Sequence, residues 1–196
     1  MRKTKTKWKA FFCVLALAAL VISGAADRVD DLVFDMLYSG NPNTRLEAAE
    51  TLGRYGGPRV VEPMIAALNE TGAIETSGRI QERAAITLGE SNDSRAVGPL
   101  IAALYKHESA WKVELAIAEA LGKLNDTRAI DPLIDSLETD GMFGYREDLV
   151  RVAIVKALAN FSDPRIVEPL TYIAKNDEDP NVRVAAVEAL WKIKAE

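Results

Sequence analysis

The side chains of this sequence that could do chemistry are few and scattered. His107 is the single histidine, and only Glu108 accompanies it. Metal sites need several imidazole, thiolate or carboxylate ligands, and one His-Glu pair does not supply them. The single cysteine, Cys13, lies in an apolar run near the N-terminus, and no nucleophile-and-base signature or glycine-rich phosphate loop is present. We therefore predict no catalytic residue, no cofactor and no metal site.

Four oxygen-bearing side chains near the C-terminus have the spacing of a calcium loop: Asp177, Asp179, Asn181 and Glu188. They match positions 1, 3, 5 and 12 of an EF-hand, but Val182 stands where the sharp turn requires glycine. The pattern Asn-Pro-Asn at residues 41–43 recurs as Asp-Pro-Asn at residues 179–181. This pattern is typical of a helix N-cap followed by proline in the first turn. We therefore predict the start of a helix here and no calcium site.

The elements that must position these residues come from a motif that recurs four times. It begins at Leu52 (LGRYGGPRVVEPM), Leu88 (LGESNDSRAVGPL), Leu121 (LGKLNDTRAIDPL) and Leu158 (LANFSDPRIVEPL). The proline next to its last residue is Pro63, Pro99, Pro132 or Pro169, so the repeats are 36, 33 and 37 residues apart. Self-similarity at this period predicts a solenoid of helix pairs.

Each motif joins two predicted helices. The residues before it, such as RLEAAETLG, place small and apolar side chains at three- and four-residue spacing, which predicts helix A with one buried stripe. The residues after it, such as GPLIAALY, predict helix B, whose proline lies in the first turn, where no N–H is needed. Residues 29–38 read as a further B helix. The predicted stack is therefore B, four AB pairs and a final A, about ten helices.

The unit resembles the short HEAT-like repeat that is also found in phycobilin lyases. The steps R-x-A-A-x-x-L-G, D-x-R and P-L-I-x-x-L carry the resemblance, which covers residues 29–194. It implies an all-α fold, a right-handed α-solenoid of about four to five HEAT-like helix pairs. Tetratricopeptide repeats keep a nearly constant period and place proline after the second helix, so they do not fit. The resemblance is informative about the fold and says little about function.

In two of the A helices another residue replaces the glycine that follows the recurring leucine of the motif, as at Gly53, Gly89 and Gly122. Ala159 replaces this glycine in the fourth unit, which indicates that the position needs a small side chain and not a left-handed backbone. We expect the following B helix to cross there. Trp191 occupies the same position in the last A helix. We expect its ring to fold over the open end of the stack as a terminal cap.

One arginine recurs in each unit, as Arg59, Arg95, Arg128 and Arg165. Three of them follow an aspartate two residues earlier, at Asp93, Asp126 and Asp163. Guanidinium groups form strong, directional hydrogen bonds with carboxylates. The repetition predicts a ladder in which each loop bonds the next, and a ligand site is the alternative.

Residues 1–26 differ from the repeats. Five cations precede an apolar run over residues 10–22, and small residues follow at 23–26. This order is typical of a secretory signal, and the run is shorter than the roughly 20 residues that span a bilayer. We therefore predict a signal peptide over residues 1–26, or alternatively an uncleaved N-terminal membrane anchor. Residues 27–196 form the repeat domain, and the protein is expected to be exported to the periplasm, the cell surface or the medium.

Charge restricts the partners. Removing the five cations of residues 1–26 leaves 19 basic residues against 29 acidic ones, a net charge of −10. A nucleic-acid binder needs a basic face to offset phosphates, so no nucleic-acid partner is predicted. Membrane contact is expected only through the N-terminal segment, if it stays uncleaved.

The outward positions of the predicted B helices are the candidate binding surface. We expect the B helices to line the concave face of the solenoid, as an acidic ridge with two tyrosines that could anchor a protein partner with a basic surface. The candidate residues are Glu62, Asn69, Tyr105, Asp131, Asp135, Glu138, Glu168 and Tyr172. An ordinary solvated helix face is the alternative.

The sequence thus predicts a non-catalytic, extracytoplasmic protein-binding scaffold and no enzyme. One alternative is a structural component of an envelope assembly. Another is an accessory subunit of a bilin-lyase-like enzyme, which rests on the resemblance alone. The predicted export weighs against the enzyme, because bilin attachment takes place inside the cell.

Overall fold

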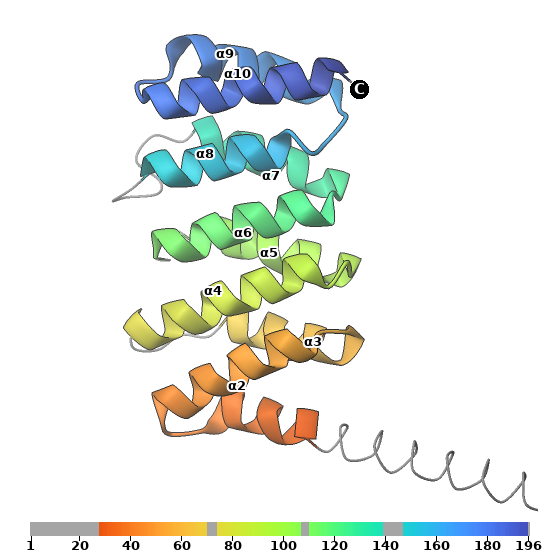
Figure 1. Cartoon of the computed structure of the whole chain (residues 1–196), viewed down its shortest axis with the longest axis vertical. Coiled ribbons are helices and arrows are strands. Elements are labelled where there is room, and N and C mark those ends of the chain that lie inside the picture. Colours follow the sequence, from red (N-terminus) through yellow and green to blue (C-terminus); the bar gives the residue numbers. More distant parts are fainter. Residues whose placement is uncertain (1–27, 70–73, 107–109, 139–146, 196) are drawn as a thin grey trace, which may run out of the picture.

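The computed structural model describes residues 28–69, 74–106, 110–138 and 147–195. Helices lie one above another along the long axis of the molecule, in chain order (Figure 1). No strand occurs in the described ranges. The predicted all-α solenoid is confirmed.

The helices follow the predicted order of B, four AB pairs and a final A. The A helices are α2 (Pro42–Tyr55), α4 (Ile74–Glu90), α6 (Trp111–Leu124), α8 (Glu147–Leu158) and α10 (Pro180–Ala195). The B helices are a helix over residues 28–38, then α3 (Pro58–Leu68), α5 (Val97–Leu104), α7 (Ile130–Glu138) and α9 (Val167–Asn176). Short 3-10 turns lead into the last three: η1 (Ser94–Ala96), η2 (Thr127–Ala129) and η3 (Pro164–Ile166).

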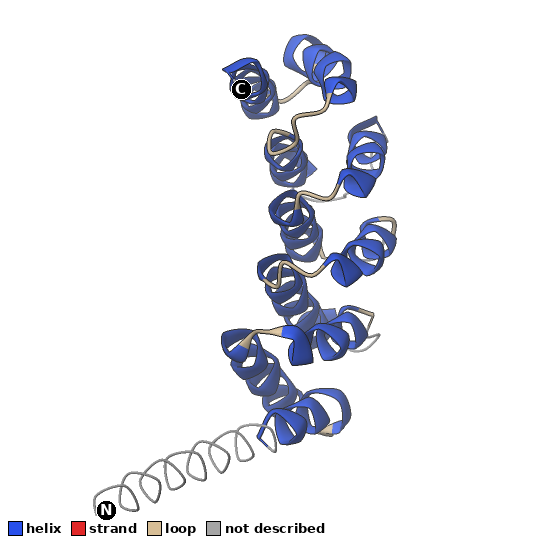
Figure 2. Cartoon of the chain, turned by 90° about the vertical axis from the view of Figure 1, so that its right-hand side faces the viewer, coloured by secondary structure: helices blue, strands red, loops and turns tan. Residues whose placement is uncertain are grey.

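The A and B helices form two layers with different spacing. A Cβ placed on Gly89 would lie 2.6 Å from the Cα of Ala120 in the next A helix, and one on Gly122 would lie 2.8 Å from the Cα of Ala157. Successive A helices share extensive contacts, whereas successive B helices share few. The stack therefore bends toward the A layer, so the A helices line the concave face and the B helices the convex face (Figure 2).

This arrangement corrects two expectations. The B helices do not line the concave face, because the close crossings are between A helices. The small residue at Gly89 and Gly122 makes room for the next A helix and not for the following B helix. Both glycines lie in helical backbone, since the described glycines with positive φ are Gly56 and Gly57. The expectation that side-chain size selects this position is confirmed.

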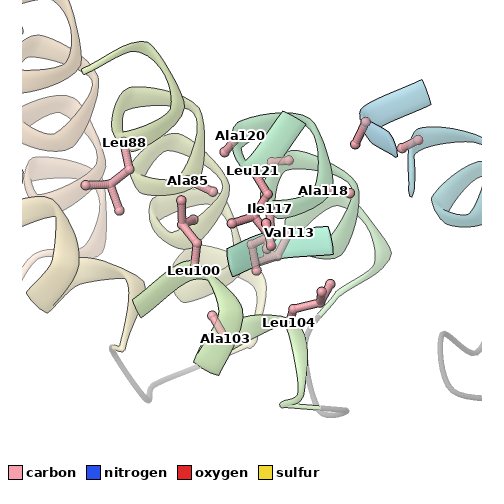
Figure 3. Packing of buried hydrophobic residues seen from close by; sticks show 14 of the residues in the cluster. Ala85, Leu88, Leu100, Ala103, Leu104, Val113, Ile117, Ala118, Ala120 and Leu121 are labelled. Carbon is pink, nitrogen blue, oxygen red and sulfur yellow. The ribbon is translucent and has the colours of Figure 1, made fainter. Parts of the chain in front are cut away.

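The hydrophobic core lies between the two layers. Figure 3 shows Leu88 of α4, Leu100 of α5 and Leu121 of α6 within it, and all three are inaccessible to solvent. Leu68 and Leu104, at equivalent positions of α3 and α5, are 2% and 1% exposed. The helix B register read from the sequence therefore matches the packing. Burial of this apolar stripe is the main stabilising contribution for each added pair.

The helix starts agree with the N-cap interpretation. The Asn41 side chain accepts a hydrogen bond from the N–H of Asn43, 3.0 Å away, at the start of α2. The Asp179 side chain accepts one from the N–H of Asn181, 2.7 Å away, at the start of α10. Within the described ranges no group of three or more His, Cys, Asp or Glu residues could hold a metal ion.

Some expectations fall on residues outside this description. The predicted signal or anchor segment, residues 1–26, lies there, and so do His107 and Glu108. No helix of the described residues has the length and apolar character needed to cross a membrane. Trp191 does lie inside the description and is 74% exposed, so its ring does not cover the end of the stack. The terminal-cap expectation is therefore wrong.

We expect Gly89→Ala to lower the free energy of unfolding by about 1–3 kcal/mol, because the new methyl group would overlap the backbone of Ala120. Gly98 is the matched control, since a Cβ there meets no atom within 4 Å. Gly98→Ala should raise the free energy of unfolding by about 0.4–1 kcal/mol. Urea denaturation measures both, and equal changes would contradict the close A-helix crossing.

Candidate functional site

The repeated arginines join one unit to the next. The Nε and Nη2 atoms of Arg95 donate to the carboxylate of Asp93 at 3.0 and 2.6 Å, while Nη1 donates to Oε1 of Glu62 in the preceding B helix at 2.9 Å. Asp93 also caps η1 by accepting from the N–H of Arg95. Hydrogen bonding to Arg95 holds the pKa of Asp93 below its ordinary value, and the same bond raises the pKa of Arg95.

Two further units repeat this bridge. Nη1 of Arg165 donates to both carboxylate oxygens of Asp131 at 2.8 and 2.9 Å. Nη2 of Arg59 donates to Oδ1 of Asp30, in the helix over residues 28–38, at 2.9 Å. Asp30, Glu62 and Asp131 occupy equivalent positions of their B helices. The predicted ladder between units is therefore confirmed, although these three arginines reach the preceding B helix and not the preceding loop.

The remaining arginine, Arg128, bonds to a different kind of partner in the preceding unit. The preceding B helix carries Gly98 at the acidic position, so Arg128 has no carboxylate to reach there. Its Nη2 donates instead to the backbone oxygen of Ser94, 3.1 Å away. Arg128 still binds Asp126, and this hydrogen bond lowers the pKa of Asp126 to about 2.

Five of the predicted site residues lie in contacts between repeats, namely Glu62, Asn69, Tyr105, Asp131 and Asp135. Glu62 and Asp131 belong to the ladder, although their side chains stay 65% and 67% exposed. The Tyr105 hydroxyl donates to Oδ2 of Asp135 in the next B helix, at 3.3 Å. The structure therefore brings these residues to one ridge, but on the convex face and partly neutralised by bonding between units.

Asn69 and the remaining predicted site residues extend the same ridge. Asn69 caps α3, and its Oδ1 accepts from Nζ of Lys106 at 2.7 Å. Glu168 and Tyr172 are exposed on α9, and neither side chain has a bonded partner within the described ranges. Glu138 ends α7, and its side chain lies outside the description. A role of this ridge in binding a partner stays a prediction.

The concave face is a second candidate surface, which the sequence interpretation missed. Its outward stripe on the A helices carries half-buried apolar side chains at Ile86, Leu115 and Val152. Exposed Lys112 and Lys156 lie on the same stripe. The sequence does not show that the A helices line the concave face, so it did not point to these positions. The stripe combines apolar surface with charges of both signs, because Glu82 and Glu119 lie on it beside the two lysines.

One buried carboxylate lies on the inner side of the A layer. Equivalent positions of the A helices hold Arg45, Gln81, Glu114, Arg151 and Arg183. Arg45 donates to the backbone oxygen of Met36 at 3.0 Å and Gln81 to that of Leu68 at 3.3 Å, near the end of the preceding B helix. Glu114 is 2% exposed and its Oε2 has no hydrogen-bond partner among the described atoms. Burial raises the pKa of Glu114 to about 7.

Sequence comparison identifies the repeat. A profile described as HEAT repeats matches residues 73–148 and 142–196, more than half of the chain. The chain belongs to the HEAT repeat family. A second profile, described as the PBS lyase HEAT-like repeat, matches residues 44–70. No curated protein matches the chain.

Structural comparison gives a similar result. The chain resembles a solved structure described as the complex of CpcE and CpcF of phycocyanin lyase from Nostoc sp. PCC7120. The TM-score is 0.71 at 24% sequence identity, and the alignment covers 86% of this chain and 65% of that chain. This chain thus spans slightly less than two thirds of the length of the matched chain. At this identity the likeness establishes the fold.

These findings correct the predicted function. The non-catalytic scaffold is contradicted, because the repeat profile and the structural relative both carry the name of a lyase. The same two findings contradict the expectation that the protein has no enzymatic role. The expected export is contradicted as well, because both findings point toward phycobilin lyases and neither supports a secreted protein. The bilin-lyase alternative is the better supported one.

Proposed function

We propose that this HEAT repeat chain is a subunit of a bilin-lyase-like enzyme and works together with a protein partner. The main support for this proposal is the structural match of its solenoid, over 86% of the chain, to the phycocyanin lyase complex. The PBS lyase HEAT-like profile at residues 44–70 supports the same reading. The partner is proposed because the matched structure is a complex of two proteins.

The concave face is the proposed contact surface for the bilin. A bilin is an extended, largely apolar tetrapyrrole with acidic side chains. Half-buried Leu115 and Val152 offer apolar surface on neighbouring helices, and Lys112 and Lys156 offer charge for the acidic groups. Lys112 also lies 5.6 Å from the ring centroid of Trp111, so an aromatic face is close to the cation. The surface thus has the mixed character that such a ligand requires.

The proposal predicts that the chain binds phycocyanobilin and speeds its covalent attachment to apo-phycocyanin. Absorbance titration measures binding, and bilin fluorescence of the acceptor in a denaturing gel measures attachment. The double variant Lys112→Glu/Lys156→Glu should weaken binding at least about tenfold, because both charges that face the acidic groups are reversed.

Lys175→Glu is the matched control. Lys175 is an exposed cation on the convex ridge, so its reversal should leave bilin binding unchanged. Equal losses in the two variants would place the bilin elsewhere. A chain that neither binds the bilin nor speeds attachment, alone or with the second subunit of the matched lyase, would refute the proposed function.

A further inference from the structure

Helix α10 exposes an apolar face that the other A helices bury. Val184, Val187 and Trp191 are 57%, 43% and 74% exposed. The residues equivalent to Val187 in the earlier A helices are inaccessible to solvent: Ala49, Ala85, Ala118 and Val155. In those helices the next A helix covers this position. The corresponding face of α10 is uncovered in the described structure.

The opposite end of the A layer has a different character. Glu47 and Thr51 occupy the positions of α2 that point away from α4, and Glu47 is exposed. The equivalent residues of α6 and α8 are buried alanines: Ala116, Ala120, Ala153 and Ala157. Solenoids need polar outer faces on their terminal repeats to stay soluble. The α2 end meets this requirement and the α10 face does not, so the α10 face is built to be covered.

Another repeat of the same kind does not fit on this face. Trp191 occupies the position of Gly89 and Gly122, where even a Cβ would lie within 2.8 Å of the backbone of the next A helix. An indole ring forces any neighbour to a wider spacing. Beside it lies an open hollow lined by Val187, Leu190, Trp191 and Lys194, which could receive a side chain from that neighbour.

We propose that the neighbour is a second copy of this chain, with the two α10 helices packed antiparallel about a two-fold axis. This pairing places Val184 of each copy against Trp191 of the other, so the apolar face covers itself. It also brings Lys194, near the end of α10, toward the exposed Glu178 that precedes α10 in the other copy. A parallel pairing would instead bring Lys194 of one copy against Lys194 of the other. The antiparallel pairing leaves the exposed Glu188 of the two copies as the like charges near the axis. Two-fold, self-complementary interfaces are the commonest way in which soluble chains associate.

Sedimentation velocity of the full chain tests this inference, which does not depend on the proposed lyase activity. One helix pair buries little area, so we expect a weak dimer that forms at concentrations on the order of 100 µM. The mass should approach about 43 kDa, twice the 21.4 kDa of one chain. Trp191→Lys should weaken association at least about tenfold. Tyr172→Lys, which replaces an aromatic residue of similar exposure on the convex ridge, should leave it unchanged.

A charge exchange tests the antiparallel geometry. Lys194→Glu should weaken the dimer, because it places two carboxylates together, and adding Glu178→Lys should restore it. All substituted residues are exposed, so circular dichroism should show unchanged helix content. A chain that stays monomeric at these concentrations, or a dimer indifferent to Trp191→Lys, would overturn the proposal. If adding Glu178→Lys to Lys194→Glu does not restore the dimer affinity, the antiparallel arrangement is wrong.

Discussion

Replacing Asp177 by alanine is expected to lower the free energy of unfolding by about 3–5 kcal/mol. The Asp177 side chain is inaccessible to solvent, and its Oδ2 accepts a hydrogen bond from Nη2 of Arg151, whose side chain is 19% exposed. Its other oxygen, Oδ1, accepts from the N–H of Asp179 at 3.0 Å. Alanine would leave the Arg151 guanidinium without this buried counter-charge and the turn before α10 without its bond. Removing one partner of a buried pair costs far more than the pair itself contributes.

Glu62→Ala is the control for this measurement. Glu62 also pairs with an arginine, Arg95, but the two side chains are 65% and 49% exposed. Exposed pairs contribute about 0–1 kcal/mol, so the loss should be small. Urea denaturation at neutral pH, followed by circular dichroism, gives both values. If the two variants lost similar stability, the Asp177 pair would not be the buried anchor of the α8–α10 junction that the structure indicates.

The Asp177 pair illustrates what the sequence does not reveal. Arg151 and Asp177 are 26 residues apart, and no local pattern links them. The sequence instead presented Asp177 as the first position of a calcium-like spacing. The Arg95 ladder, in contrast, was predictable, because Asp93 lies two residues away in a motif that recurs along the chain. Interactions that repeat with the unit are readable from sequence, and single interactions between units are not.

The curvature of the stack shows the same limit. The sequence identified Gly89 and Gly122 as positions that need a small residue, but not the helix that approaches them. That helix is the next A helix, and its approach decides which layer is concave. The candidate residues Glu62 and Tyr172 were therefore placed on the correct exposed ridge but on the wrong side of the curve. Helix order depends on local periodicity, whereas curvature depends on spacing between units.

Glu114 gives the second large expected effect, which depends on pH. Burial raises its pKa to about 7 from an ordinary value of 4.5. The folded protein therefore binds a proton that the unfolded chain has released between these two pH values. Stability from this residue is fully present below about pH 4.5, is lost as the pH rises toward 7, and stays lost above it. At about 1.4 kcal/mol per pKa unit, the loss amounts to at most about 3.5 kcal/mol.

Glu114→Gln should therefore stabilise the protein by about 1–3 kcal/mol at pH 8 and by much less at pH 5. Glutamine keeps the shape of the side chain and removes the charge. It is also the residue that the preceding unit uses, where Gln81 donates to the backbone oxygen of Leu68. Urea denaturation at the two pH values measures the difference. Glu119→Gln, on the exposed side of the same helix, should change stability little at either pH. A stabilisation by Glu114→Gln that is equal at pH 5 and pH 8 would show that Glu114 is not held as a buried carboxylate with a raised pKa.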